Sequence, residues 1–175
     1  IDKILEIALE ILFFFRRKRK GKRMKGQVDE EIDLIVIHVP PLGRTGISRK
    51  QTFEVCHRRR GFNGIGYHFY IRKNGDIKTT RPIERIGAHA KGFNRTSIGI
   101  CYEGGLDCYG RPADTRTEWQ VHSMHVLVLT LLRDYPGCRV CGHRDLSPDL
   151  NGNGEIEPEE WVKACPCFDA EEEWA

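Results

Sequence analysis

The sequence has no apolar run long enough to cross a bilayer. Its most apolar segment, residues 4–15, is about 12 residues long, whereas a spanning helix needs about 20. The segment contains Glu6 and Glu10, and it precedes a basic run, which is the reverse of the order in a secretory signal peptide. We therefore expect neither a membrane-spanning helix nor a classical signal peptide in this chain.

A large excess of charge of one sign is also missing. The formal net charge is only +3, and eight of the ten residues at 16–25 are Lys or Arg. Without that run the remainder is slightly acidic, so we expect no nucleic-acid partner. Three interpretations of residues 4–25 stay open: an amphipathic helix on an anionic membrane surface, the end of a membrane anchor, or an extension upstream of a native start at Met24. We treat residues 1–27 as an N-terminal extension.

The cysteines do not form the even set of a small secreted disulfide scaffold. There are seven, irregularly spaced, in a chain long enough to bury a sizeable hydrophobic core. This usage favours free thiols and a metal ligand, with a bridge between Cys101 and Cys108 left open. The CxxC pair Cys138 and Cys141 would point to opposite sides of a strand, which argues against chelation or redox pairing there.

Apolar, β-branched runs predict three buried strands. They cover residues 33–39, 97–102 and 139–142. A β-hairpin is expected where Asn74-Gly75 separates two further strand-like runs, 66–72 and 76–80. This antiparallel hairpin, together with the alternation of strands and helices elsewhere, indicates a mixed sheet.

Two helices are predicted from capping boxes, in which Ser or Thr is followed three residues later by Gln or Glu. The first covers residues 48–60, and the second starts at residues 115–118 and ends before Pro136. No internal repeat is present. We expect a single α/β (α+β) domain over residues 28–175, with a central mixed sheet and flanking helices.

Two histidines and one cysteine suggest a catalytic metal site. His38 and His143 lie at the ends of predicted strands, and Cys165 precedes a proline. A catalytic zinc typically takes three such ligands and leaves one position to water, whose pKa it lowers to about 7. Spacing alone does not select this set, because the chain has seven histidines and seven cysteines. A core histidine with an inert thiol, or a four-cysteine zinc knot, is the alternative at this point.

Several ordered motifs resemble a known family. They are Gly66-Tyr-His-Phe69, Gly87-Ala-His-Ala-Lys-Gly-Phe-Asn94, Ser97-Ile-Gly-Ile100 and Lys163-Ala-Cys-Pro166. From about residue 33 to residue 169 the chain resembles the zinc-dependent N-acetylmuramoyl-L-alanine amidases of type 2. That family includes phage amidase-type lysozymes and the animal peptidoglycan recognition proteins.

The resemblance implies a reaction and a role for each matching residue. The enzyme would hydrolyse the amide between the lactyl group of N-acetylmuramic acid and the L-alanine of the peptidoglycan stem peptide. The zinc ligands would be His38, His143 and Cys165. Tyr67 matches the catalytic tyrosine of the family, and Lys163 matches the lysine that stabilises the oxyanion.

Two further histidines and two departures from the family pattern bear on the site. His89, in an irregular Gly-rich stretch, is expected to line the substrate groove, whereas His68, beside Tyr67, is expected to be structural. Residues 39–42 replace the small, polar stretch of many members, which affects the substrate contacts expected near His38. The long gap at residues 148–163 has almost no counterpart in compact phage members.

The gap contains a loop, residues 149–160, that follows the calcium-binding EF-hand pattern. Oxygen donors stand at loop positions 1, 3, 5, 9 and 12, Gly stands at position 6, and position 7 needs only a backbone carbonyl. The residues concerned are Asp149, Asn151, Asn153, Glu155, Glu157 and Glu160. We expect Ca²⁺ to order the segment that follows the loop, and a solvated Asn-Gly-rich turn is the alternative.

The expected partner is peptidoglycan or a muropeptide, and the expected cofactors are Zn²⁺ and, at the loop, Ca²⁺. An alternative function is a non-catalytic peptidoglycan-binding module of the recognition-protein type. Another is a membrane-associated or regulatory protein that works through residues 4–25. We expect a monomeric hydrolase of the endolysin type, bacterial or phage-encoded, made in the cytoplasm and acting in cell wall degradation.

Overall fold

A five-stranded mixed β-sheet organises the part of the chain that the computed structural model describes, residues 31–40 and 65–175. The strand order is β3-β2-β4-β1-β5. The strands are β1 (Leu34–His38), β2 (Phe69–Ile71), β3 (Ile77–Thr79), β4 (Ser97–Tyr102) and β5 (Arg139–Gly142). All neighbouring pairs are parallel except β2–β3, which is the predicted antiparallel hairpin. The predicted mixed sheet and its strands are therefore confirmed.

The apolar composition of β1 and β4 explains why they lie at the centre of the sheet. Every residue of β1 and β4 is buried, as expected for β-branched runs covered on both faces of a parallel sheet. Because β1 and β5 are parallel neighbours, their carboxyl ends lie at the same edge of the sheet. His38 is the last residue of β1, and His143 directly follows β5, so this edge holds both predicted histidine ligands.

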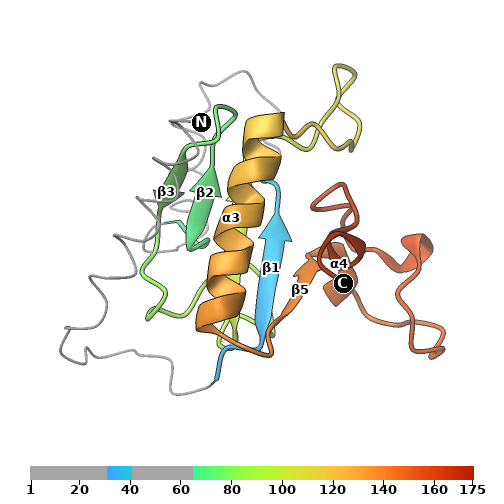
Figure 1. Cartoon of the computed structure of the whole chain (residues 1–175). Coiled ribbons are helices and arrows are strands. Elements are labelled where there is room, and N and C mark those ends of the chain that lie inside the picture. The colour runs from blue at the N-terminus through green and yellow to red at the C-terminus, as the bar shows by residue number, and fades with distance from the viewer. Residues whose placement is uncertain (1–30, 41–64) are drawn as a thin grey trace.

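The long helix α3 (Glu118–Asp134) lies across one face of the sheet (Figure 1). Its buried side chains join the main core, and they include Met124, Leu127, Val128 and Leu131. The predicted helix is confirmed, but its capping box is wrong by two residues. The N-cap is Thr117, paired with Gln120, because the hydroxyl of Thr115 instead accepts a hydrogen bond from the backbone N–H of Gly105 at 2.8 Å.

Short elements complete the described structure after β5. They are the 3₁₀ turns η2 (Arg144–Leu146) and η3 (Pro158–Glu160) and the helix α4 (Ala170–Glu173). The segment between β5 and α4 extends outward from this edge strand, and α4 then returns to pack on β5 (Figure 1). No helix within residues 31–40 and 65–175 has the length and apolar character needed to cross a membrane.

The described cysteines are all free thiols, so the bridge left open between Cys101 and Cys108 is not formed. Cys101 is buried in β4, whereas Cys108 is exposed. Cys138 packs against the main core, and Cys141 belongs to a second cluster with Leu34 and Val36 on the other side of the sheet. The prediction that the CxxC pair points to opposite faces is confirmed. The predicted helix at 48–60, the extension 1–27 and Cys56 lie outside the fully described residues.

Candidate metal centre

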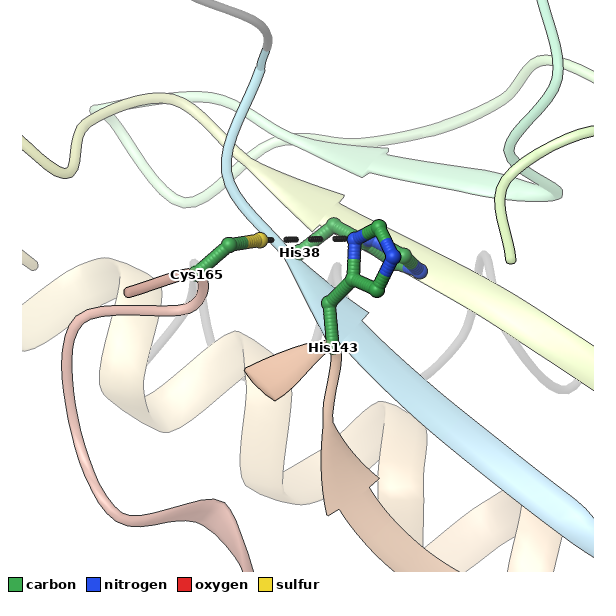
Figure 2. Close-up of side chains that lie close together, drawn as sticks. All are labelled: His38, His143 and Cys165. Carbon is green, nitrogen blue, oxygen red and sulfur yellow. Dashed lines mark hydrogen bonds between the residues drawn. The ribbon is translucent and has the colours of Figure 1, made fainter. Parts of the chain in front are cut away.

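Three side chains from distant parts of the sequence meet at the carboxyl edge of the sheet. His38 comes from β1, His143 from the turn after β5, and Cys165 from the irregular segment before α4 (Figure 2). One ligand atom from each lies within 4.8 Å of the others. The Cys165 Sγ is 3.9 Å from Nδ1 of His38, and the His38 and His143 ring centroids are 4.8 Å apart. Among the described residues this is the one group of three or more His, Cys, Asp or Glu side chains placed to hold a metal ion.

Backbone hydrogen bonds tie the three segments together beside each candidate ligand. The N–H of Val39, next to His38, donates to the Cys165 sulfur at 3.2 Å. The N–H of His143 donates to the Ile37 carbonyl oxygen at 3.2 Å, and the N–H of Arg144 donates to the carbonyl oxygen of Cys165 at 2.7 Å. Backbone hydrogen bonds of the fold therefore hold the three candidate ligands next to one another.

A core residue also holds the segment that contains Cys165. The hydroxyl of Tyr102, a fully buried residue of β4, donates to the carbonyl oxygen of Pro166 at 2.7 Å. The Cys165–Pro166 peptide bond is cis. The spacing of the sequence gives no signal of the contact between Tyr102 and Pro166, which holds the residue after Cys165 in place.

Burial sets the protonation of the three candidate ligands. It lowers the pKa of His38 well below its usual value, helped by His89, His143 and Lys163, and it lowers the pKa of His143 to about 4, helped by Lys163. Both imidazoles are consequently neutral at pH 7 and can offer a lone pair. Burial raises the pKa of the Cys165 thiol to about 12, against the Val39 N–H, which lowers it. Two neutral imidazoles and one thiol are a donor set that suits zinc once the thiol loses its proton.

Tyr67 lies beside this cluster, immediately before β2 and not within it. Its ring centroid is 5.0 Å from that of His38, and the residue is only 7% exposed. The structure thus brings the sequence-predicted tyrosine to the candidate ligands.

Lys163 lies two residues before Cys165 and is exposed. Its positive charge contributes to the lowered pKa of both His38 and His143, so the ammonium group acts on the cluster electrostatically. A cation exposed to solvent therefore acts on the neutral imidazoles of the buried His38 and the half-buried His143.

His68 has the structural role predicted for it. Its Nδ1 accepts a hydrogen bond from the Gly99 N–H at 3.0 Å, and its Nε2 faces the Arg85 carbonyl oxygen at 3.0 Å. The ring therefore ties β4 to the segment after the hairpin.

His89, which was predicted to line the substrate groove, is buried beside the candidate ligand His38. Its contact with substrate stays a prediction. His89 is only 8% exposed, and its Nδ1 is 3.0 Å from Nε2 of His38. Burial, followed by the neighbouring His68 and His143, lowers the pKa of His89 to about 3, so its ring is neutral. This contact could not be predicted from the sequence, because hydrophobic periodicity carries no information about irregular segments.

The carboxylate of Asp145 stabilises the turn that contains His143. The Asp145 carboxylate accepts a hydrogen bond from the Gly142 N–H at 2.6 Å, across the turn. The Arg144 guanidinium bonds to Asp145 and Asp169 and stacks on the Trp161 ring at 4.3 Å. These contacts join the end of β5 to the chain on both sides of Cys165.

Residues 149–160 form an ordered loop whose carboxylates bind backbone N–H groups. Asp149 accepts from Gly152 and Gly154, and its pKa is lowered by these N–H donors. Glu160, 8% exposed, accepts from Leu150, Asn151 and Glu157. No carboxylate of the loop belongs to the metal-type cluster described above. The predicted calcium site stays a prediction.

This site belongs to a chain that matches a family of peptidoglycan amidases. The profile of the N-acetylmuramoyl-L-alanine amidases matches residues 28–166, which is most of the chain. The protein is therefore a member of the N-acetylmuramoyl-L-alanine amidase family, as its motifs suggested.

Individual relatives include two phage endolysins and one uncharacterised protein. The endolysin of Klebsiella phage KP32 is 34% identical over 145 residues, covering 83% of this chain and 87% of its own. The endolysin of Escherichia phage T7 is 31% identical over 155 residues, covering 87% and 91%. An uncharacterised protein of Haemophilus influenzae is 49% identical over 96 residues, covering 55% of this chain and 83% of its own.

Solved structures share the fold. The endolysin N-acetylmuramoyl-L-alanine amidase LysCS of Clostridium intestinale superposes with a TM-score of 0.60 at 26% identity, covering 86% of this chain and 85% of its own. The Drosophila peptidoglycan recognition protein LB has a TM-score of 0.59 at 22% identity, covering 83% and 82%. At that identity the second likeness concerns the fold alone.

Proposed function

We propose that the protein is a zinc-dependent N-acetylmuramoyl-L-alanine amidase. It hydrolyses the amide between the lactyl group of N-acetylmuramic acid and the L-alanine of peptidoglycan. The observation that carries the proposal is the convergence of His38, His143 and Cys165 in a chain whose residues 28–166 match this amidase family. Relatives named as endolysins support the cell wall as the place of action.

His38, His143 and Cys165 would hold the zinc ion. Their donor set fits zinc because the two imidazoles are neutral and the thiol receives a hydrogen bond from the Val39 N–H, which favours its ionised form. When bound there, zinc lowers the pKa of a water molecule and polarises the substrate carbonyl.

Lys163 and Tyr67 are proposed to act on the reacting amide. The Lys163 ammonium offers a positive charge to the oxyanion that develops on the substrate carbonyl. The Tyr67 hydroxyl would hold the attacking water or the oxyanion by a hydrogen bond and relay a proton to the leaving amine. The position of the tyrosine ring beside His38, at a centroid distance of 5.0 Å, supports this role.

A non-catalytic peptidoglycan-binding module is the second candidate. The shared fold of the recognition proteins supports it, and one of their solved structures is bound to tracheal cytotoxin. Loss of the cysteine ligand would favour that candidate, whereas here Cys165 is present, buried and close to both histidines. The complete ligand group therefore favours the enzyme.

A metal analysis combined with a peptidoglycan digest tests the proposal. We expect about one zinc ion per purified chain, and we expect digestion to release stem peptides with free L-alanine amino groups. A protein that holds zinc and binds muropeptides but releases no such peptides would be a binding module. A protein that neither binds zinc nor cleaves peptidoglycan would contradict the proposed function.

Three lesser expectations belong to the same proposal. We propose that the enzyme is a monomer, which light scattering in solution would test. Contact of residues 4–25 with anionic membranes would appear as co-sedimentation with anionic vesicles that a variant lacking those residues does not show. Calcium binding by residues 149–160 calls for calorimetry on the zinc-loaded protein.

A further inference from the structure

The ring of His38 has two neighbours, one at each nitrogen. Its Nδ1 is 3.9 Å from the Cys165 sulfur, on the side of the candidate ligands. Its Nε2 is 3.0 Å from Nδ1 of His89, on the buried side. Only Nδ1 therefore faces the metal cluster, and the opposite nitrogen is engaged within the protein.

A consistent direction of hydrogen bonds follows from this arrangement. A neutral His38 that offers Nδ1 to a metal carries its proton on Nε2, and it can donate that proton to Nδ1 of His89. His89 then carries its own proton on Nε2, which is 3.4 Å from the Ser97 hydroxyl oxygen. The Ser97 hydroxyl donates in turn to the carbonyl oxygen of Phe93 at 2.6 Å. Each hydrogen bond in this series is donated away from the metal cluster, and the series ends at the Phe93 carbonyl oxygen, which can only accept.

The position of His89 is itself fixed by its surroundings. The side-chain oxygen of Asn94 accepts from the backbone N–H groups of His89 and Ala90, at 2.7 and 2.9 Å. Glycines line the ring on two sides. A Cβ atom at Gly87 or Gly99 would lie 2.5 or 2.7 Å from Cδ2 of His89, so only glycine leaves space for the imidazole. Asn94, Gly87 and Gly99 therefore fix the position of the His89 imidazole.

We propose that His89, oriented by Ser97, is a positioning residue for the metal ligand His38. It selects the tautomer of His38 that presents Nδ1 to zinc and prevents the ring from rotating away. Histidine ligands of metals usually donate their second nitrogen to a carboxylate, a carbonyl or water, and loss of such a partner typically weakens metal binding about 10–100-fold. Here a second, neutral histidine takes that place. The inference rests on the proposed zinc site.

Zinc affinity of four variants, measured by competition with a chromophoric chelator, tests the inference. His89→Ala removes the acceptor, and we expect zinc binding to weaken about 10–100-fold. His89→Asn places a carbonyl oxygen close to the position of Nδ1, and we expect it to restore most of the loss. Ser97→Ala frees the His89 ring to turn and should weaken zinc binding by a smaller factor.

His68→Ala is the matched control. His68 is also buried, and its ring centroid is 5.7 Å from that of His89, but its two nitrogens bond to Gly99 and Arg85. This variant should lower the unfolding temperature of the metal-free protein without a matching loss of zinc affinity. The visible spectrum of the cobalt-substituted protein gives a second readout, since it should change in His89→Ala and return toward that of the wild type in His89→Asn.

The outcomes separate this inference from the proposed function. Equal zinc affinity in wild type and His89→Ala would overturn the positioning role while leaving the zinc site intact. Equal losses in His89→Ala, His89→Asn and His68→Ala would show a purely structural effect and overturn it as well. A wild-type protein without zinc affinity would contradict the proposed function itself. If His89→Ala does not fold, the comparison of Ser97→Ala with His68→Ala decides the question.

Discussion

The metal cluster and the loop 149–160 both gather ligand-type side chains, but they are built in opposite ways. His38, His143 and Cys165 come from separate segments, and the bonds that hold them run between those segments. The loop draws its side chains from one continuous stretch, and its carboxylates accept from N–H groups within that stretch. The cluster is a product of the tertiary fold, whereas the loop is a product of local sequence.

This difference predicts how far a change in each region spreads. The candidate ligands come from three segments, and His38 and Cys165 are buried whereas His143 is half-buried. The loss of one ligand therefore removes a function that the others cannot supply. The loop is mostly exposed and bonded to itself, so a change there should stay local.

The largest effect is expected from removing a ligand of the cluster. Cys165→Ala deletes the only sulfur of the group, so zinc should be lost and amide hydrolysis should fall roughly 10³-fold or more. Metal analysis and a muropeptide digest on the same sample measure both effects. Cys167→Ala is the control, because that sulfur bonds to the Gly105 carbonyl oxygen at 3.3 Å and lies outside the group. Wild-type turnover in Cys165→Ala would rule out the assignment of the site.

Removing the positive charge of Lys163 should lower turnover and leave zinc binding intact. In Lys163→Met we expect kcat to fall roughly 10²–10³-fold, as for the loss of one oxyanion-stabilising group. Zinc affinity should be retained, because the ammonium is not a ligand. Lys78→Met, an exposed lysine on β3, is the matched control and should leave kcat unchanged. A change in KM alone would instead assign Lys163 to substrate binding.

Removing a single hydroxyl beside the cluster should have a somewhat smaller effect. In Tyr67→Phe the ring that packs beside His38 is kept, so the fold and zinc affinity should be unchanged. We expect kcat to fall roughly 10²-fold, the lower end of the range for a general acid–base group. A variant with full activity would make Tyr67 a packing residue.

The strand ends could be predicted from the sequence because parallel strands leave a strong local pattern. The β-branched run before His38 and the short strand before His143 gave the correct sheet edge. The position of Cys165 had no such pattern, since its segment is irregular and depends on bonds from Arg144 and Tyr102. Only the resemblance to the amidases selected it from the seven cysteines.

The misplaced capping box and the missed contact of His89 with His38 have the same cause. Thr115 and Thr117 both precede α3, and the choice between them depends on Gly105, a residue distant in sequence that occupies the Thr115 hydroxyl. The contact of His89 with His38 was missed because His89 lies in an irregular, Gly-rich stretch. Its burial depends on Gly87 and Gly99 leaving room for the ring, which is a property of packing and has no local signal.

Zinc removal tests whether the fold alone maintains the cluster. Because backbone bonds join the three segments, we expect the metal-free protein to stay folded, with an unchanged far-ultraviolet circular dichroism spectrum. Ligand binding at a thousandfold excess over Kd stabilises a protein by about 4 kcal/mol, so the unfolding temperature should fall by roughly 10 °C on chelation. Readdition of zinc should restore it. Loss of secondary structure on chelation would mean that the ion, and not the sheet, assembles the site.

The smallest effect is expected from the loop. Glu160→Gln weakens a carboxylate that accepts from three backbone N–H groups, those of Leu150, Asn151 and Glu157. Hydrogen exchange should accelerate at these amides, while zinc affinity should stay within about twofold of the wild type because the effect remains local. Glu159→Gln, an exposed neighbour, is the control.

Calorimetry with calcium on the wild type and on Glu160→Gln completes the comparison. Binding to the wild type that is lost in Glu160→Gln would establish the loop as a metal site, because the twelfth position of such a loop supplies two oxygen ligands. If the wild type shows no heat of calcium binding, the loop is not a calcium site. In that case the N–H groups that already bond to Asp149 and Glu160 are sufficient to order the loop, and hydrogen bonding alone links its two ends.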